Sequence, residues 1–123
     1  MSEELLLTAY ERGWNAHDPD VCAACFSHDA TRRSLLHDAP PATVGRDAIR
    51  EGIASVMEAL PDLAVEVVAA GYCSDRRLWT EWRAAGTPAA GGAMLEVLGV
   101  SVFRLSNAGF VEERLYWDSA FAR

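Results

Sequence analysis

Hydrophobic and polar positions along the chain predict helices in its first half and strands in its second. Apolar residues recur at steps of three and four from about Glu3 to Ala16 and from Arg46 to Leu60, the spacing of a helix with one buried face. A shorter helix is predicted from Pro19 to Phe26, with Asp18 as its cap. Two prolines make His37 to Thr43 a loop. The predicted strands are Ala30 to Leu36, Leu63 to Cys73, Leu78 to Thr87, Glu96 to Leu105 and Phe110 to Asp118.

This order of elements, α-α-β-α-β-β-β-β, indicates an α+β fold, because the helices are segregated from a run of consecutive strands. Nothing resembling a linker or an internal repeat interrupts it, so residues 1–123 are expected to form a single domain. We expect a curved antiparallel sheet wrapped by three helices. Such a cone-shaped sheet encloses a space that becomes either core or pocket.

The last two predicted strands form a hairpin around the turn residues Ser106 to Gly109. The first strand is almost continuously apolar, which is typical of a strand covered on both faces. In the second strand, alternation puts Glu113 on the same side as Leu115 and Trp117, together with Val111. A carboxylate beside apolar residues is expected in a pocket with a working acid, although an ordinary sheet edge has the same pattern. A register slip by one residue would point Glu112 and Arg114 inward instead.

Composition narrows the range of partners. Half of the 123 residues are hydrophobic, and the formal net charge is −7 with no lysine, which disfavours nucleic acid and anionic membranes. No apolar run is long enough for a transmembrane helix, and the N-terminus lacks the basic region of a signal peptide.

The three cysteines, Cys22, Cys25 and Cys73, are expected to be buried, reduced thiols of a cytoplasmic protein. No metal-ligand spacing, phosphate loop or nucleotide fingerprint is present, so neither a metal nor a cofactor is expected.

Several short motifs, spread over nearly the whole chain, occur in an order that resembles one family. The motifs are Trp14-Asn15-Ala16-His17-Asp18, Val44-Gly45-Arg46-Asp47-Ala48-Ile49, Pro61-Asp62, Trp79-Thr80-Glu81-Trp82, Gly86-Thr87, Gly99 to Arg104 and Val111-Glu112-Glu113 with Tyr116-Trp117-Asp118. They are similar to motifs of the SnoaL-like polyketide cyclases of the nuclear transport factor two-like superfamily, which also includes ketosteroid isomerase and limonene epoxide hydrolase. The resemblance implies a cone-shaped α+β fold and a homodimer formed through the outer face of the sheet.

The catalytic residues of the family do not carry over as a set. The acid-base Asp that the cyclases and epoxide hydrolases place on the last strand corresponds to Leu115 here. The Arg and Asp of the epoxide hydrolases correspond to Trp82 and Ala84. The ketosteroid isomerase positions, a Tyr and two Asp, fall on Tyr10, on or near Ser34, and on Ser101.

The same register predicts which side chains face the cavity: Arg32, Ser34, Trp82, Ser101, Glu113, Leu115 and Trp117. Arg32 and Glu113 are the candidate chemical pair. A carboxylate near an arginine stays ionised and takes a proton from an acidic carbon or a water, while the arginine steadies a developing enolate oxygen. The alternative is a buried structural ion pair.

Other candidates carry two interpretations each. His37 and Asp38, on the loop at the predicted mouth, are either a proton shuttle or solvated loop residues. Tyr10 either donates to a ligand carbonyl or is an ordinary core tyrosine whose hydroxyl reaches a neighbour. Trp14, like Trp82 and Trp117, is expected to form a wall of the cavity.

Two main functions follow. The first is a cofactor-free enzyme of secondary metabolism, cyclase- or isomerase-like, that removes a proton next to a carbonyl of a small apolar, oxygenated metabolite. Glu113 would be the base, with Arg32, Tyr10 and Ser101 orienting the substrate or its oxyanion. The second is a non-catalytic module for hydrophobic-ligand binding or dimerisation, favoured by the missing family Asp residues. Epoxide hydrolysis ranks third because its Arg and Asp are absent.

Overall fold

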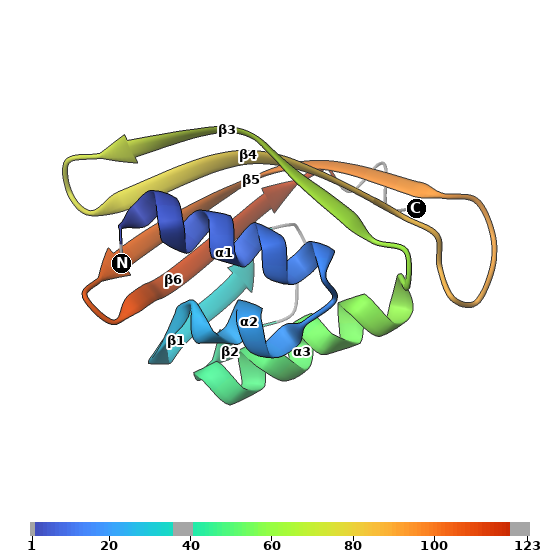
Figure 1. Ribbon diagram of the computed structural model, residues 1–123, viewed down its shortest axis with the longest axis horizontal. Coiled ribbons are helices and arrows are strands. Elements are labelled where there is room, and N and C mark those ends of the chain that lie inside the picture. Colours follow the sequence, from blue (N-terminus) through green and yellow to red (C-terminus); the bar gives the residue numbers. More distant parts are fainter. Residues whose placement is uncertain (1, 36–40, 119–123) are drawn as a thin grey trace.

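The computed structural model describes residues 2–35 and 41–118, in which three helices lie against one face of a curved, unclosed sheet (Figure 1). The α+β prediction is therefore confirmed. The elements are α1 (Glu3–Asn15), α2 (Pro19–Ala24), β1 (Phe26–Ser34), β2 (Thr43–Val44), α3 (Arg46–Ala59), β3 (Ala64–Cys73), β4 (Arg77–Gly86), β5 (Leu95–Ser106) and β6 (Gly109–Trp117).

The described strands form one six-stranded sheet in the order β2-β1-β6-β5-β4-β3. The three sequential hairpin pairings, β3 with β4, β4 with β5 and β5 with β6, are antiparallel as expected, as is β1 with β2. The expectation of a wholly antiparallel sheet is wrong at one place, because β1 and β6 run parallel. That pairing joins distant parts of the chain and brings Arg32 directly opposite Glu113.

The boundary between α2 and β1 differs most from the sequence prediction. Helix α2 ends at Ala24, and β1 begins at Phe26 instead of Ala30. Phe26 is fully buried and pairs with Phe110 of β6, a long-range partner that overrides the local helical pattern. The predicted loop ends at Thr43, which together with Val44 forms the two-residue strand β2; this strand pairs with Thr31 and Arg32 of β1.

Helix α1 is fixed at both ends. Ser2 caps it by accepting a hydrogen bond from the Leu5 backbone N–H at 3.2 Å. Near its other end, the Asn15 side-chain amide exchanges two hydrogen bonds with the Val65 backbone, at 2.7 and 2.8 Å, and Glu11 accepts from the Val67 N–H at 2.7 Å. These side chains occupy backbone groups of the edge strand β3, so α1 is held across one side of the sheet.

A β-bulge in β6 sets which side chains face inward. The register with β5 shifts between Arg104 and Leu105, where one extra residue, Val111, enters β6. Val111 was expected to share the inner face with Glu113, but Phe110 is the buried residue there. The alternation from Glu113 onward follows the prediction.

An aromatic cluster forms the core beneath the helices. Phe103 and Phe110 stack with ring centroids 4.2 Å apart, and the Tyr10 ring contacts both of them edge-on. Tyr10 also meets Phe26 and Trp14 edge-on. Edge contacts with four rings fix the direction in which the Tyr10 hydroxyl points.

The outer face of the sheet is less covered than the apolar pattern of β5 predicted. Leu98 is 48% exposed and Val100 37%, so the expectation that both faces of this strand are covered is wrong for the isolated chain. The alternate residues Ser101 and Phe103 are buried on the inner face. Strand β5 is apolar on both sides, but the helices cover only one of them.

The cysteine prediction holds for two of the three residues. Cys22 and Cys25 are buried, and burial raises the pKa of the Cys22 thiol to about 12 and that of Cys25 to about 11. Cys73 is exposed at the end of β3, so its predicted burial is wrong.

Among the described residues, no helix has the length and apolarity needed to cross a membrane.

Gly109, the first residue of β6, has a backbone conformation that favours glycine. Its φ is +111°, and an added Cβ would lie 2.4 Å from the Cys25 carbonyl oxygen. We expect Gly109→Ala to lower the free energy of unfolding by at least about 2 kcal/mol, measured by urea denaturation, because alanine cannot adopt this backbone without strain.

The matched control is Gly52→Ala in α3, where an added Cβ meets nothing within 4 Å. This variant is expected to gain about 0.5–1 kcal/mol through higher helix propensity. Equal urea midpoints for Gly109→Ala and the unmodified chain would contradict the described turn.

Candidate functional site

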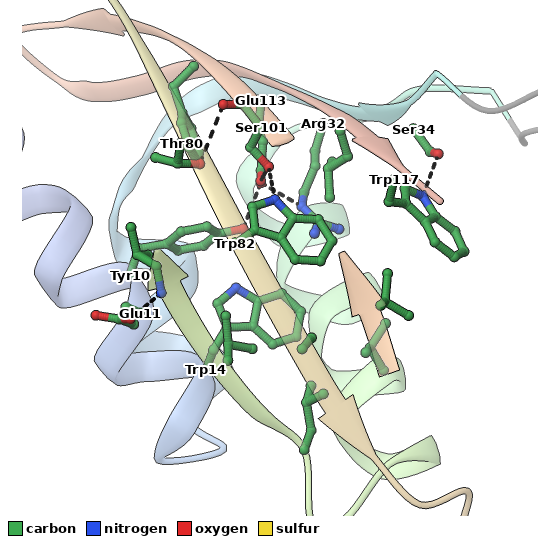
Figure 2. A pocket seen from close by; sticks show the side chains of 18 of the residues that line it. Tyr10, Glu11, Trp14, Arg32, Ser34, Thr80, Trp82, Ser101, Glu113 and Trp117 are labelled. Carbon is green, nitrogen blue, oxygen red and sulfur yellow. Dashed lines mark hydrogen bonds and ion pairs between the residues drawn. The ribbon is translucent and has the colours of Figure 1, made fainter. Parts of the chain in front are cut away.

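A cavity of about 410 Å³ lies between α1, α3 and the inner face of the sheet. Figure 2 shows its polar and aromatic residues, which come from α1, β1, β4, β5 and β6. Apolar side chains complete the wall. They include Leu7, Val56, Leu60, Leu63, Val65, Val67, Ala84, Val97, Phe103 and Leu115.

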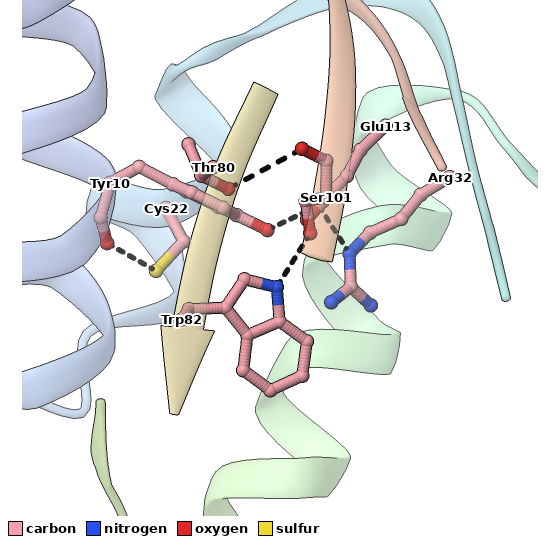
Figure 3. Close-up of polar contacts among 7 residues, drawn as sticks. All are labelled: Tyr10, Cys22, Arg32, Thr80, Trp82, Ser101 and Glu113. Carbon is pink, nitrogen blue, oxygen red and sulfur yellow. Dashed lines mark hydrogen bonds and ion pairs between the residues drawn. The ribbon is translucent and has the colours of Figure 1, made fainter. Parts of the chain in front are cut away.

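Glu113 is the buried charged residue at the centre of the site. It is 2% exposed and accepts hydrogen bonds from three side chains of the described residues. Its Oε1 accepts from the Tyr10 hydroxyl at 2.7 Å and from Arg32 Nε at 2.8 Å, whereas its Oε2 accepts from the Ser101 hydroxyl at 2.8 Å (Figure 3). Every one of these partners donates, so the group has the role of an ionised carboxylate.

Arg32 provides the opposite charge from the neighbouring strand. Burial lowers the pKa of its guanidinium, but the charges of Tyr10 and Glu113 and their hydrogen bonds outweigh burial, so the pKa is raised above its ordinary value. The guanidinium also lies 5.6 Å from the centre of the Trp14 ring. Its two terminal nitrogens point away from Glu113 (Figure 3), and 20% of the side chain is exposed along the cavity.

Tyr10 remains a proton donor in this environment. Burial raises its pKa well above the ordinary value; the Arg32 charge opposes that rise and Glu113 adds to it. The aromatic core positions the ring, and the hydroxyl reaches Glu113. Tyr10 is thus a core tyrosine whose hydroxyl reaches a neighbouring side chain, the Glu113 carboxylate, as the second interpretation from the sequence expected.

Two tryptophans in the cavity wall donate to serines. Trp82 Nε1 donates to Ser101 Oγ at 2.9 Å, and Trp117 Nε1 donates to Ser34 Oγ at 3.0 Å. With both indole N–H groups engaged, these rings present mainly apolar surface to the cavity.

The structure brings together all the predicted site residues that it describes. His37 and Asp38, predicted at the mouth, lie outside the described residues. The cavity is lined by Tyr10, Trp14, Arg32, Ser34, Trp82, Ser101, Glu113, Leu115 and Trp117.

The alternative register, with Glu112 and Arg114 inward, is excluded. Neither residue lines the cavity, and Arg114 instead donates to the Tyr116 hydroxyl at 2.6 Å. Thr80 also lines the cavity, although the sequence did not predict it there; its hydroxyl donates to the Ser101 carbonyl at 3.4 Å. Alternation in the predicted strand contained the signal, because Thr80 shares a face with Trp82. Within the described part of the chain, no group of three or more His, Cys, Asp or Glu is placed to bind a metal ion.

Comparison with solved structures identifies the fold. A protein from Catenulispora acidiphila with a ketosteroid isomerase-like fold, solved in complex with trimethylamine, superposes with a TM-score of 0.85 at 16% identity, covering 98% of this chain and 90% of that one. SalBIII, an epoxide hydrolase/cyclase-like enzyme with a role in pyran ring formation in the polyether salinomycin, gives 0.82 at 21% identity, covering 96% and 92%. Rv0760c from Mycobacterium tuberculosis, solved with estradiol-17β-hemisuccinate, gives 0.80 at 18% identity, covering 96% and 95%.

Sequence comparison gives the family. No curated protein sequence matches the chain. The family model described as the SnoaL-like domain matches residues 7–113, a span that runs from α1 to Glu113 in β6 and so contains most of the residues around the cavity. The protein therefore belongs to the SnoaL-like domain family.

Proposed function

We propose that the protein is a cofactor-free enzyme that removes a proton next to a carbonyl group of a small, apolar, oxygenated metabolite. Glu113 is the base and Arg32 stabilises the enolate oxygen that forms. Ring closure, isomerisation or loss of water then follows from the enolate, as in a cyclase- or isomerase-like enzyme of secondary metabolism.

The observation that carries this proposal is an ion pair buried in the wall of an apolar cavity. Moving a carboxylate and a guanidinium out of water costs free energy, and apolar residues of similar size often stabilise a fold equally well or better. Stability alone is therefore a weak reason for a chain to bury such a pair. Glu113 and Arg32 both line the open space instead of filling the core. Their position suits a reaction more than a structural role.

Charge balance explains why a neutral carbonyl substrate suits the pair. Glu113 and Arg32 carry opposite charges, so the substrate enters a site without net charge from this pair. When the C–H bond breaks, the proton moves to Glu113 and the electron pair moves to the carbonyl oxygen. The Arg32 guanidinium then faces a negative enolate in place of a negative carboxylate. It therefore has one negatively charged partner both before and after the proton moves. An anionic substrate would bring an unpaired charge into an apolar space.

The hydrogen bonds on Glu113 assign different roles to its two oxygens. Among the described residues, Oε1 accepts two donors and Oε2 accepts one. A carboxylate oxygen has two lone pairs, so Oε2 retains one for the substrate proton. In this proposal the Tyr10 hydroxyl orients the carboxylate. The terminal nitrogens of Arg32 donate to the carbonyl oxygen of the substrate, which becomes the enolate oxygen.

The alternative function, a binding module for a hydrophobic ligand, is supported by the same three hydrogen bonds. They hold the Glu113 carboxylate in place as they would in a purely structural ion pair. The cavity would then bind an apolar molecule without chemical change. Proton exchange separates the two functions.

The test uses 2-tetralone, an apolar ketone with acidic α-hydrogens, in D₂O. We expect the protein to catalyse deuterium incorporation at the α-carbon, followed by NMR. Glu113→Gln is expected to slow exchange at least about 100-fold, the range for loss of a general base. Its matched control, Glu112→Gln, changes the adjacent carboxylate that lies outside the cavity and is expected to stay within about twofold.

Equal exchange rates with the unmodified protein and Glu113→Gln would reject Glu113 as the base. Binding of 2-tetralone without catalysed exchange would support the binding-module alternative.

We also propose that a second copy of the chain covers the outer face of the sheet. This face is the one that the helices leave open, and the register places its exposed apolar residues close together around β5. Burying them removes apolar surface from water, which favours association. The residues are Val68, Trp79, Leu98, Val100 and Tyr116.

Light scattering tests the homodimer. The unmodified protein is expected to have the mass of two chains, and Leu98→Glu is expected to shift it to one, because burying a carboxylate among these apolar side chains costs more than burying leucine. Leu5→Glu is the control, since Leu5 is 61% exposed on α1, away from this face. A monomeric unmodified protein, or a dimeric Leu98→Glu variant, would contradict the proposal.

A further inference from the structure

A chain of hydrogen bonds leads from Trp82 to the proposed base. Trp82 Nε1 donates to Ser101 Oγ at 2.9 Å, and Ser101 Oγ donates to Glu113 Oε2 at 2.8 Å (Figure 3). Ser101 is 1% exposed, so bulk water does not compete for its hydroxyl. The chain ends on the oxygen that retains a lone pair for the substrate proton.

The direction of this chain follows from the indole. An indole nitrogen donates and cannot accept, whereas a serine hydroxyl has one hydrogen and accepts on its other side. While Trp82 occupies the accepting side, the single hydrogen of Ser101 is directed to Glu113. Loss of the indole N–H would free the hydroxyl to rotate and accept a hydrogen bond from another group, the substrate included.

Gly99 makes the position of Trp82 possible. The two residues are direct partners in the pairing of β4 with β5, and both belong to the inner face. A Cβ on Gly99 would lie 2.4 Å from the Trp82 ring, a distance that real contacts do not reach. The indole therefore lies across the space of a missing side chain, with its N–H at Ser101.

We propose that Trp82, seated on Gly99, is a positioning residue that acts through Ser101 to hold Oε2 of Glu113 in place for proton removal. This inference rests on the proposed function, because it assigns a role in the same reaction. Trp82 fixes the Ser101 hydrogen on Oε2 and so leaves one defined lone pair toward the substrate.

The second Trp–Ser contact provides a matched control. Trp117 donates to Ser34 at 3.0 Å, and it also lines the cavity, whereas the described donors to Glu113 are Tyr10, Arg32 and Ser101. Trp82→Phe and Trp117→Phe each remove one indole N–H while keeping an aromatic wall. A role in positioning predicts different kinetic effects, whereas general damage to the cavity predicts similar ones.

The kinetic test measures exchange of 2-tetralone in D₂O at increasing ketone concentrations. Trp82→Phe is expected to lower the maximal exchange rate about tenfold with little change in the half-saturating concentration, because freeing the Ser101 hydroxyl loses its charge-assisted hydrogen bond to Glu113. Ser101→Ala is expected to have the same effect, and the double variant no more than either, because both changes break one chain. Trp117→Phe is expected to alter the half-saturating concentration instead.

Gly99→Ala tests the packing of the Trp82 ring over Gly99 without removing the indole N–H of Trp82. The added methyl group displaces the indole from Ser101, so this variant is expected to reproduce Trp82→Phe. Additive losses in the Trp82→Phe/Ser101→Ala double variant, or equal effects of Trp82→Phe and Trp117→Phe, would overturn the inference.

A ligand-free measurement separates failure of this inference from failure of the proposed function. In ¹H–¹⁵N NMR spectra, Glu113→Gln is expected to shift the indole N–H signal of Trp82 and leave that of Trp117 in place. If Trp82 does not respond, the inference falls even where Glu113-dependent exchange is observed. If Trp82 responds but the unmodified protein exchanges no faster than Glu113→Gln, the proposed function falls, and with it the catalytic role of Trp82.

Discussion

The ion pair between Glu113 and Arg32 is the interaction on which the architecture of the site depends. A carboxylate that is 2% exposed is costly unless each of its oxygens is paired. The compensating donors come from three different elements, with Arg32 on β1, Ser101 on β5 and Tyr10 on α1. The parallel pairing of β1 with β6 supplies the charge, and the aromatic core supplies the hydroxyl. The fold therefore converges on this carboxylate.

The cavity gives a bound molecule access to the Glu113–Arg32 ion pair. Strong donors hold an ionised carboxylate against an open apolar space, where a bound molecule would meet it without intervening bulk water. By the resemblance, the position of the family's acid-base Asp falls on Leu115, which lies two residues further along β6 than Glu113 and lines the same cavity. Its cross-strand neighbours are Ser34 on β1 and Ser101 on β5, so no carboxylate occurs at this position or at its two direct partners. The substrate contacts of this chain are thus expected to differ from those of relatives with the Asp.

Local periodicity accounts for the parts that the sequence predicted. Alternation along β6 put Glu113, Leu115 and Trp117 on one face, and the structure places all three in the cavity wall. The parallel pairing of β1 and the bulge at Val111 were not predictable, because both depend on contacts between distant strands. The sequence paired Arg32 with Glu113 and put Ser101 on the same side of the sheet. It did not indicate that the hydroxyls of Tyr10 and Ser101 donate to the Glu113 carboxylate, because those contacts depend on three-dimensional positions.

The most direct test of the account is a crystal structure of the protein soaked with 2-tetralone. The account predicts the ketone in the cavity, with its carbonyl oxygen within hydrogen-bond distance of a terminal nitrogen of Arg32 and its α-carbon next to Oε2 of Glu113. A ketone bound with its carbonyl group away from Arg32, or an Oε2 closed off from the ligand by Ser101 and Trp82, would contradict the central claim.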